Sequence, residues 1–281
     1  MSWTWLDDGA GLASIVAPCE ALATPRVSLP GMPTPIPIPL ETGRLVLFGG
    51  SFDPPHRAHL FFARFLLDRL DDASLVMVPA ARSPHKQSGP VAPAQHRVEM
   101  LRLGLHDVGL GIREVEEGRP LRAGVWTDEI DRAEAGEPSY WVDTLRRARR
   151  LLPQSVRLGF VIGSDQVAAF HRWREPHAIL GLASPIVLVR GDGSFPDGSI
   201  VRQCDAEMVA DMLQPGDEWT ESERARFAAG VQIGQPTMKI ASTRIRQQLQ
   251  TDPNAPVLEE WLTESVLRFI RREGLYRGCA S

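Results

Sequence analysis

Apolar and polar residues follow two different rhythms along the chain. Short, nearly continuous apolar runs, such as RLVLF at 44–48 and RLGFVIG at 157–163, are typical of strands that are buried on both faces. Longer segments with apolar residues three and four positions apart, such as HLFFARFLLDRL at 59–70, are typical of amphipathic helices. The runs expected to form strands are 44–48, 74–79, 112–116, 157–163, 185–191 and 237–240. The segments expected to be helical are 59–70, 94–105, 139–152, 242–250 and 258–274.

This alternation of strands and helices predicts an α/β protein. Strands that are apolar on both faces need helices on both sides, so the expected fold is a doubly wound, mostly parallel sheet in a single domain over 44–281. The segment 191–236 is polar, rich in Gly and Asp and only weakly periodic. It is therefore expected to be an insertion or a lid.

The first 43 residues have a different composition. Seven prolines lie within 18–39, and the run PTPIPIP favours extended polyproline over helix or central strand. Residues 1–43 are therefore expected to be a flexible leader that buries no core. Two alternatives stay open: translation that starts at Met32, and a docking arm that carries Trp3 and Trp5.

Composition narrows the class of protein. The net charge of −4 lacks the basic excess of a nucleic-acid-binding protein, so no nucleic-acid partner is expected. No apolar stretch approaches the roughly 18 residues of a membrane span, and the N-terminus lacks the pattern of a signal peptide. The three cysteines, Cys19, Cys204 and Cys279, are widely spaced and form neither a disulfide pattern nor a zinc motif. We expect a cytoplasmic protein that contacts no membrane.

A glycine-rich turn, FGGSFDPPHRAHL at 48–60, follows the first expected strand. Ligands of parallel α/β sheets bind at the carboxyl ends of strands, where this turn falls. Gly49 and Gly50 let a ligand approach the backbone, and the following helix start favours an anion. The prolines stiffen the turn so that His56 and His59 can face one anionic centre. A metal site remains an alternative for H-x-x-H, although the sequence nominates no third ligand.

A second element, KIASTRIRQQL at 239–249, resembles another anion cradle. A short strand runs into a helix that opens with Ser242 and Thr243, whose hydroxyls and free N–H groups can face a phosphate. Arg246 lies one turn further on. The alternative is an ordinary N-cap followed by a solvated arginine. Neither a P-loop nor a G-x-G-x-x-G fingerprint occurs in the chain. Taken with the first element, this second element would supply the other half of a polyphosphate site.

Together the two elements resemble the (H/T)-x-G-H and I-S-S-T-x-x-R motifs of the nucleotidyltransferase superfamily. Within it, the chain resembles bacterial nicotinate-nucleotide adenylyltransferases from Arg44 to Tyr276. The supporting strings are GGSFDPPHRAH at 49–59, VPAARSPHK at 78–86, SYWVDTL at 139–145, VIGSDQ at 161–166, FHRWREPHAIL at 170–180, IASTRIR at 240–246 and EGLY at 273–276. The departures are Ala58 for glycine, Ala241 for serine, Trp141 for threonine, and Arg190-Gly191-Asp192 for Arg-Pro-Gly.

The resemblance implies a Rossmann-like nucleotidyltransferase fold that transfers the adenylyl group of ATP to nicotinate mononucleotide, a step of NAD biosynthesis. It implies that His56 and His59 are catalytic and that Mg²⁺ is bound through the ATP phosphates, with no metal ligands from the protein. The implied ATP contacts are Gly49, Gly50, Ser51, Phe52, Gly163, Asp165, Ser242, Thr243 and Arg246. The implied acceptor contacts are His85, Lys86, Ser139, Tyr140, Trp141, Thr144, Trp173 and Arg190.

Several alternatives remain open beside this interpretation. Trp173 suits a core aromatic residue as well as a ring that stacks on nicotinate. The acceptor could be nicotinamide mononucleotide or phosphopantetheine, and the fold could belong to a non-catalytic nucleotide-binding protein. A homo-oligomer is also left open.

Overall fold

A computed structural model gives the fold of the unit that runs from Pro33 to Ser281. The structure describes residues 33–39, 43–82, 89–133, 138–167, 169–191, 201–203, 219–228, 231–236 and 240–277.

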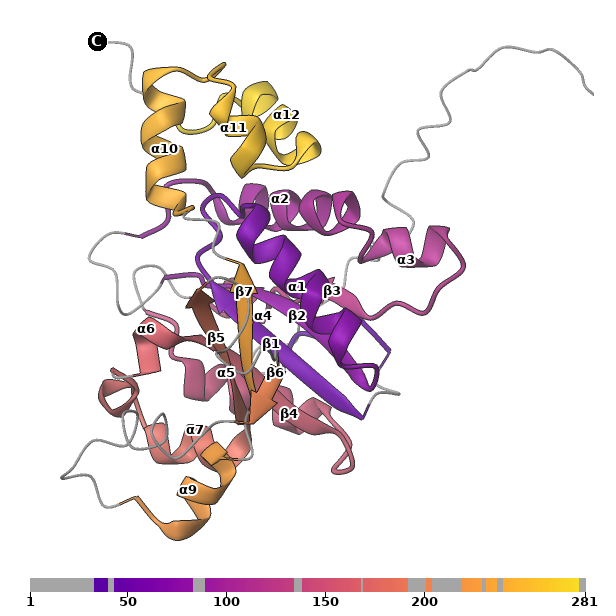
Figure 1. Ribbon diagram of the computed structural model, residues 1–281, viewed down its shortest axis with the longest axis vertical. Coiled ribbons are helices and arrows are strands. Elements are labelled where there is room, and N and C mark those ends of the chain that lie inside the picture. The colour runs from indigo at the N-terminus through magenta and orange to yellow at the C-terminus, as the bar shows by residue number, and fades with distance from the viewer. Residues whose placement is uncertain are drawn as a thin grey trace, which may run out of the picture. The chain divides into compact units, whose positions relative to one another are not determined.

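The described strands form one seven-stranded sheet in the order β3-β2-β1-β4-β5-β7-β6 (Figure 1). Their bounds are Arg44–Gly50 (β1), Ala73–Pro79 (β2), Ala123–Val125 (β3), Arg157–Gly163 (β4), Ser184–Gly191 (β5), Val201–Gln203 (β6) and Val231–Pro236 (β7). Neighbours from β3 to β7 pair in parallel, whereas β6 runs antiparallel to β7. The expected α/β fold with a mostly parallel sheet is confirmed.

Alternate residues of β1 explain why its sequence is apolar throughout. Leu45 and Leu47 pack into one core cluster, and Val46 and Phe48 pack into a second cluster on the opposite face. Helices α5 (Trp141–Leu151) and α7 (Pro176–Leu182) cover the first face, and α1 (Arg57–Arg69) and α2 (Ala94–Asp107) cover the second. Burying each such side chain contributes about 1.5–3 kcal/mol, so both faces hold the sheet in place.

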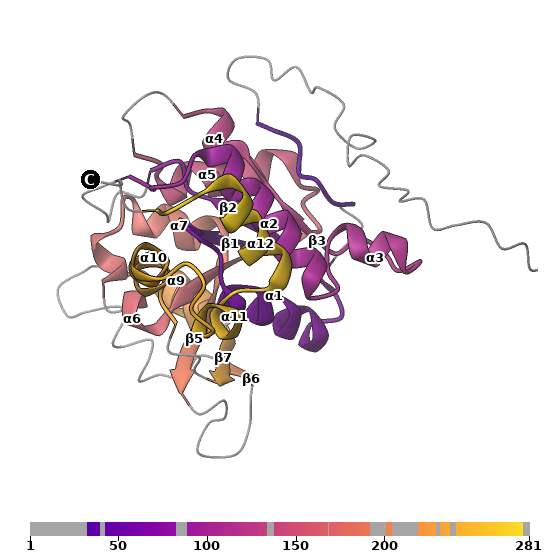
Figure 2. The ribbon, with the colours of Figure 1, turned by 90° about the horizontal axis from the view of Figure 1, so that it is seen from above.

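The C-terminal helices form a third core cluster against α2. They are α10 (Ser242–Thr251), α11 (Val257–Trp261) and α12 (Glu264–Glu273). Met100 of α2 lies in this cluster with Ile245 of α10 and Trp261 of α11. Figures 1 and 2 show the three helices gathered at one end of the sheet, where the start of α10 approaches the turn after β1.

One of the expected strands is wrong. The segment IREVE at 112–116 is helix α3 (Ile112–Glu116), and the third strand of the sheet is β3, further along the chain. Glu114 of α3 is buried, and its carboxylate accepts the N–H groups of Gly111, Arg122 and Ala123 at 3.0–3.2 Å. These contacts outweigh the strand preference of a five-residue segment. The expected strand 237–240 lies outside the described residues except for Ile240.

The segment 191–236 also differs from the expected insertion or lid in its described parts. It contains β6, helix α9 (Glu221–Ala228) and β7, and β7 pairs with β5 over Ile186–Gly191. Near the C-terminus, the single expected helix at 258–274 is two helices, because α11 ends at Trp261 and α12 begins at Glu264.

Residues 33–38 of the expected leader belong to the folded unit. Ile36 and Ile38 are 9% and 6% exposed and lie in the core cluster that includes Trp126. The Trp126 indole Nε1 donates to the carbonyl of Thr34 at 2.7 Å, and the Thr34 N–H donates to Asp128 Oδ1 at 2.9 Å. The expectation that nothing before residue 44 contributes to the core is therefore wrong for this segment. Residues 1–32 and 40–42 of the leader lie outside the described residues.

Candidate active site

The turn after β1 starts with two glycines that have side chains directly above them. A Cβ atom on Gly49 would lie 2.6 Å from Cζ3 of Trp141, and one on Gly50 would lie 2.9 Å from Cζ of Phe52. Phe52 adopts a positive φ of 48° and is 2% exposed, packed edge-on against Phe48 at 5.6 Å between ring centroids. Phe52 thus packs against the turn as a buried side chain, and its contact with ATP stays a prediction.

His56 and His59 lie together where this turn enters α1. Their rings stack at 3.7 Å between centroids with an interplanar angle of 22°, and His56 is 6% exposed. The main-chain N–H of His56 donates to Nδ1 of His59 at 3.3 Å. Because Nδ1 accepts, Nε2 is the N–H donor of the His59 ring. Phe48 and Phe52 contact the same ring edge-on and fix its orientation.

The Asp53 carboxylate, within the same turn, binds two other segments of the chain. Its carboxylate accepts the N–H groups of Val91 and Ala92 at 2.7 and 3.0 Å, and the hydroxyl of Tyr276 at 2.8 Å. Burial, together with the negative charge of Asp53, raises the pKa of the Tyr276 hydroxyl, so it stays a donor. Sequence reasoning gave no role to Asp53 or Tyr276, although both lie in motifs that carry the resemblance.

The start of α10 meets this turn from the other end of the sequence. Ser242 Oγ donates to the carbonyl of Pro54 at 2.9 Å, and Arg246 Nη1 donates to the carbonyl of Asp53 at 2.7 Å. Arg246 Nη2 also lies 3.4 Å from the hydroxyl of Thr243. The structure therefore brings together the two elements that the sequence suggested would form one phosphate site.

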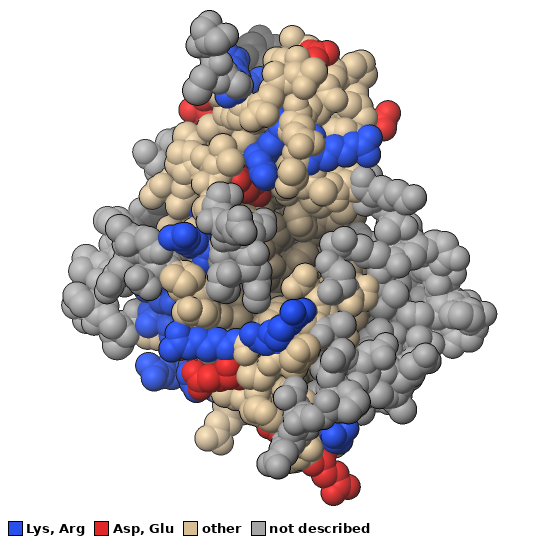
Figure 3. All heavy atoms as spheres, turned by 90° about the vertical axis from the view of Figure 1, so that its left-hand side faces the viewer, with Lys and Arg blue, Asp and Glu red and all other residues tan. Residues whose placement is uncertain are grey.

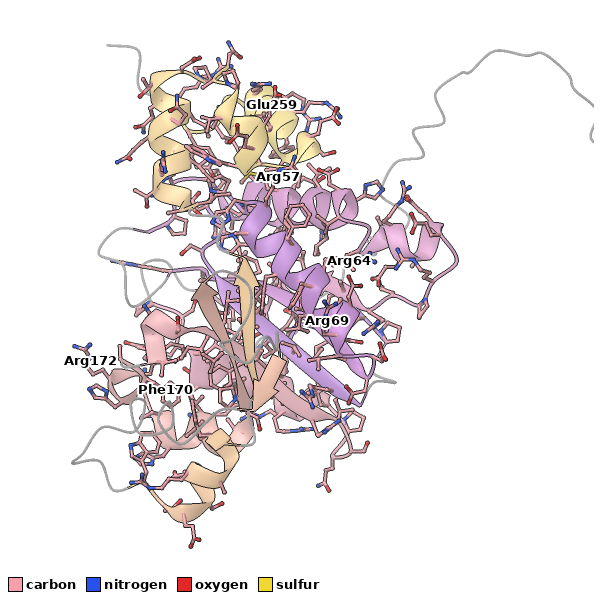
Figure 4. All side chains as sticks on the ribbon, in the orientation of Figure 1. Arg57, Arg64, Arg69, Phe170, Arg172 and Glu259 are labelled. Carbon is pink, nitrogen blue, oxygen red and sulfur yellow. The ribbon has the colours of Figure 1, made fainter. Side chains whose placement is uncertain are left out.

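Arg57 strengthens the contact between the turn and the C-terminal helices. Its Nε donates to the carbonyl of Leu262 at 3.0 Å, and its Nη2 donates to the carbonyl of Glu259 at 3.1 Å. Figure 4 shows Arg57 at the start of α1, directed toward Glu259 of α11. The first residue of α1 is thus tied to the cluster that carries Ser242 and Arg246.

A cavity of about 580 Å³ lies beside the glycines of the turn. Seven of the expected site residues line it, namely Gly49, Gly50, Ser51, Ser139, Tyr140, Trp141 and Trp173. Seven residues that sequence reasoning did not assign to the site line it as well, namely Val78, Ala80, Glu129, Val161, Arg172, Arg174 and Ile179. The carboxyl ends of β1, β2 and β4 thus share one cavity with the start of α5, as expected for a parallel α/β sheet.

The aromatic residues of the cavity are held by packing. Trp141 lies against Gly49, and its Nε1–H is buried without a hydrogen-bond partner among the described residues. The Trp173 ring packs against Phe170 at 5.4 Å between centroids. The Arg174 guanidinium lies 4.3 Å from the centre of the Tyr140 ring, a cation–π contact at the rim of the cavity.

Arg97 connects the turn to the neighbouring strand. This side chain is 2% exposed, and Nη1 donates to the carbonyls of Ser51 and Ala80, both at 2.8 Å. Desolvation by burial lowers the pKa of the guanidinium, while the nearby charge of Asp53 opposes that effect. No local pattern singled out this arginine, because it occurs within an ordinary amphipathic helix.

A buried carboxyl forms part of the cavity wall. Glu129, in helix α4 (Asp128–Asp131), is 3% exposed, and its Oε1 accepts the hydroxyl of Thr144 at 2.5 Å. Thr144 is fully buried and does not line the cavity, and its hydroxyl donates to the Glu129 carboxylate. The expected direct contact between the Thr144 side chain and the acceptor is therefore not supported by its position.

Positive charge surrounds the opening of this face. Arg172 and Arg174 are exposed and line the cavity. Figure 4 shows Arg172 pointing outward while Phe170 of the same short 3-10 helix (Phe170–Arg172) points inward. Figure 3 shows a hollow on this face with Lys and Arg side chains above and below it. Such a field favours anionic ligands.

The remaining expected site residues have different positions. Gly163 ends β4, and Asp165 lies in helix α6 (Ser164–Val167) directly after it. Arg190 lies in β5, and the side chains of Asp165 and Arg190 are outside the described part of the structure, as are His85 and Lys86 entirely. Among the described residues, no three His, Cys, Asp or Glu side chains group as metal ligands. No helix in the described ranges has the length and hydrophobicity needed to cross a membrane.

Comparison with known proteins gives a consistent family assignment. A family model described as cytidylyltransferase-like matches residues 47–248. A protein named "Probable nicotinate-nucleotide adenylyltransferase" from Chromobacterium violaceum is 31% identical over 83% of this chain and 99% of its own length. Its counterparts from Rhodopirellula baltica and Thermus thermophilus are 34% and 32% identical, over 73% and 83% of this chain and 81% and 100% of their own lengths.

Solved structures share the fold. A nicotinic acid mononucleotide adenylyltransferase of Plasmodium falciparum complexed with NaAD superposes with a TM-score of 0.56. The match is 17% identical and covers 83% of this chain and 97% of that protein. The same protein complexed with APC gives a TM-score of 0.55 with the same identity and coverage. At this identity the likeness shows the fold alone.

Proposed function

The chain belongs to the cytidylyltransferase-like family, and relatives above 30% identity along most of its length place it among the nicotinate-nucleotide adenylyltransferases. From this membership we propose the following adenylyl transfer. The 5′-phosphate of nicotinate mononucleotide attacks the α-phosphorus of ATP. A P–O bond to the acceptor forms as the bond to the bridging oxygen of the β-phosphate breaks. The products are deamido-NAD and pyrophosphate.

The proposed reaction does not require a general base from the protein. The nucleophile is already an anion, so the protein has to position the reactants and stabilise the negative charge on the α-phosphoryl group and the leaving pyrophosphate. A preorganised donor for such charge is worth about 10²- to 10³-fold in rate. The residues proposed for this role are the donors of the turn and of the start of α10.

The observation that carries this proposal is the contact between the turn and α10. Ser242 and Arg246 bond to the carbonyls of Pro54 and Asp53, next to the stacked histidines. Donors from two ends of the chain are thereby fixed around one position before ligand binds. Preorganisation of this kind is what charge stabilisation in the transition state requires.

The stacked histidines act on the α-phosphate in this proposal. His59 has its Nδ1 occupied by the N–H of His56, so the ring donates through Nε2. We place the β- and γ-phosphates at Ser242, Thr243 and Arg246, and the ATP ribose at Asp165. ATP enters as its Mg²⁺ complex, which neutralises phosphate charge, and the ion is held by the phosphates and water.

The acceptor occupies the cavity of about 580 Å³. Its aromatic walls, Trp141 and Trp173, suit a flat pyridine ring, and the arginines at the rim suit an acceptor with phosphate and carboxylate groups. His85 and Lys86 are proposed to reach the same acceptor. Nicotinate mononucleotide combines a flat ring with both anionic groups, so it fits this lining.

Pyrophosphate release measures the reaction directly. The chain is incubated with Mg²⁺, ATP and one acceptor at a time, either nicotinate mononucleotide, nicotinamide mononucleotide or phosphopantetheine, and the dinucleotide product is identified by mass. We expect stoichiometric pyrophosphate and deamido-NAD with nicotinate mononucleotide. Absence of pyrophosphate with all acceptors would indicate a non-catalytic nucleotide-binding protein, and preference for phosphopantetheine would indicate a different transferase.

A further inference from the structure

Two consecutive carboxyl groups of α4 have opposite environments. Asp128 is fully buried and paired with two arginines: Arg147 Nε at 2.7 Å and Arg132 Nε at 3.3 Å. Glu129 is 3% exposed and makes no ion pair within the described part of the chain. Of the two, Glu129 lines the cavity. An unpaired carboxyl in the wall of a ligand cavity is costly to keep ionised, so its position calls for a functional explanation.

Hydrogen bonds hold the Glu129 carboxyl in place. Thr144 Oγ1 donates to Oε1 at 2.5 Å, and Arg132 Nη2 donates to Thr144 Oγ1 at 2.9 Å. The Ser139 side chain lowers the pKa of the same carboxyl, as a hydrogen-bond donor does. Both Ser139 and Thr144 flank the start of α5, next to Tyr140 and Trp141 of the cavity. The carboxyl is therefore fixed beside the residues that we assign to the acceptor.

The charge state of this carboxyl depends on few neighbours. Desolvation by burial raises the pKa of Glu129 above its ordinary value, and the hydrogen bond from Thr144 and the charge of Arg132 oppose that effect. The nearby groups of other elements are Arg97 of α2, which stays cationic over the accessible pH range, and the paired Asp128. Glu129 is thus the group in this wall whose charge can change.

We propose that Glu129 is an acceptor-discriminating residue, a carboxyl of the cavity wall that accommodates the carboxylate of nicotinate mononucleotide in its protonated form and repels it when ionised. This inference rests on the proposed function. Nicotinate mononucleotide differs from its amide by one negative charge on the ring substituent. The pyridinium ring, the ribose and the phosphate are common to both acceptors. The amide is therefore a control for every acceptor interaction except that of the ring carboxylate charge.

The test is the ratio of kcat/KM for nicotinate mononucleotide to kcat/KM for nicotinamide mononucleotide, measured from about pH 5.5 to pH 8.5. Ionisations of ATP, of the shared acceptor phosphate and of the catalytic residues cancel in this ratio. We expect it to fall with rising pH by about tenfold, the size expected for two like charges within one cavity at the effective dielectric of a protein. In Glu129→Gln the ratio should be independent of pH and close to the low-pH ratio of the unmodified chain.

Two further variants separate this role from a structural one. Thr144→Val removes the donor that favours the ionised carboxylate, so the midpoint of the ratio should move to higher pH. Glu99→Gln, on the exposed surface of α2, is the matched control and should leave the profile unchanged. Melting temperatures verify that each variant is folded.

The outcomes distinguish the inference from the proposed function. A ratio that does not change with pH in the unmodified chain, or a Glu129→Gln profile like that of the unmodified chain, would overturn the role of Glu129 while leaving adenylyl transfer intact. Failure of both mononucleotides to release pyrophosphate would instead contradict the proposed function itself.

Discussion

Arg246 donates to the main-chain carbonyl of Asp53 at 2.7 Å across a separation of 193 residues in the sequence. This bond joins helix α10 to the turn that carries both histidines. The carboxylate of Asp53 in turn accepts the hydroxyl of Tyr276. The turn after β1 is therefore held by the C-terminal part of the chain, and its geometry depends on contacts that form only after the whole domain has folded.

Replacing Arg246 by alanine should lower kcat/KM by about 10²-fold, because the change removes a charged donor from the proposed pyrophosphate site. Arg244→Ala is the matched control on the same helix. Its guanidinium lies 4.9 Å from the centre of the Trp261 ring, so its loss should cost about 0.5–1 kcal/mol of stability with little effect on turnover. Steady-state kinetics and thermal melting compare the two. Equal activities in the two variants would remove Arg246 from the site.

His59→Ala should lower turnover by about 10²-fold or more and leave the fold intact, since one preorganised donor to the phosphate is lost. His106→Ala provides a control, because His106 lies on the surface at the end of α2 and contacts Glu116 at 3.1 Å. Single-turnover rates with saturating ATP measure the chemical step. Near-normal turnover in a His59→Ala protein with normal melting would reject the catalytic role.

The sequence predicted the parts of the site that are local. The turn after β1 and the start of α10 each have a continuous motif, and a parallel sheet places strand ends at one edge. Their meeting could be predicted from topology, and the bonds of Ser242 and Arg246 to that turn agree with it. Seven expected contacts line one cavity for the same reason.

The features that the sequence did not predict depend on tertiary contacts. Glu129 and Arg97 act through partners outside their own elements, so no local spacing marks them. Tyr276 lies in the EGLY motif, but its partner Asp53 is 223 residues away in the sequence. Glu114 is similar, because its carboxylate is held by three N–H groups that all lie outside the segment 112–116. The strand β3 has three residues, too few for a periodic pattern.

Replacing both Ile36 and Ile38 by alanine should lower the free energy of unfolding by about 4 kcal/mol, because two buried side chains are truncated in the core. Val91→Ala, at a position that is 61% exposed, should change it by less than about 0.5 kcal/mol. Chemical denaturation measures all three proteins. A double variant as stable as the control would show that residues 33–38 add nothing to the core.

Gly49→Ala should damage the acceptor cavity, because the new methyl group would lie 2.6 Å from the Trp141 ring and must displace it. We expect a loss of about 1–3 kcal/mol in stability and a higher KM for the acceptor. Gly89→Ala, where an added Cβ meets nothing within 4 Å, is the control. In a Trp141→Thr background the clash disappears, so the two changes should show a coupling energy of about 1–3 kcal/mol. Additive effects would contradict the contact between Gly49 and Trp141.

The choice of acceptor tests the central claim most directly. The ratio of kcat/KM for nicotinate mononucleotide to that for its amide, measured near pH 6, should favour the acid by about 1–3 kcal/mol for each mismatched buried hydrogen bond, or roughly 5- to 150-fold. Trp141 is the position at which the acceptor preference could differ, because nicotinate-nucleotide adenylyltransferases typically have threonine there. A strong preference for the acid is the predicted result. Equal values, or a preference for the amide, would contradict assignment to the nicotinate branch while leaving adenylyl transfer possible.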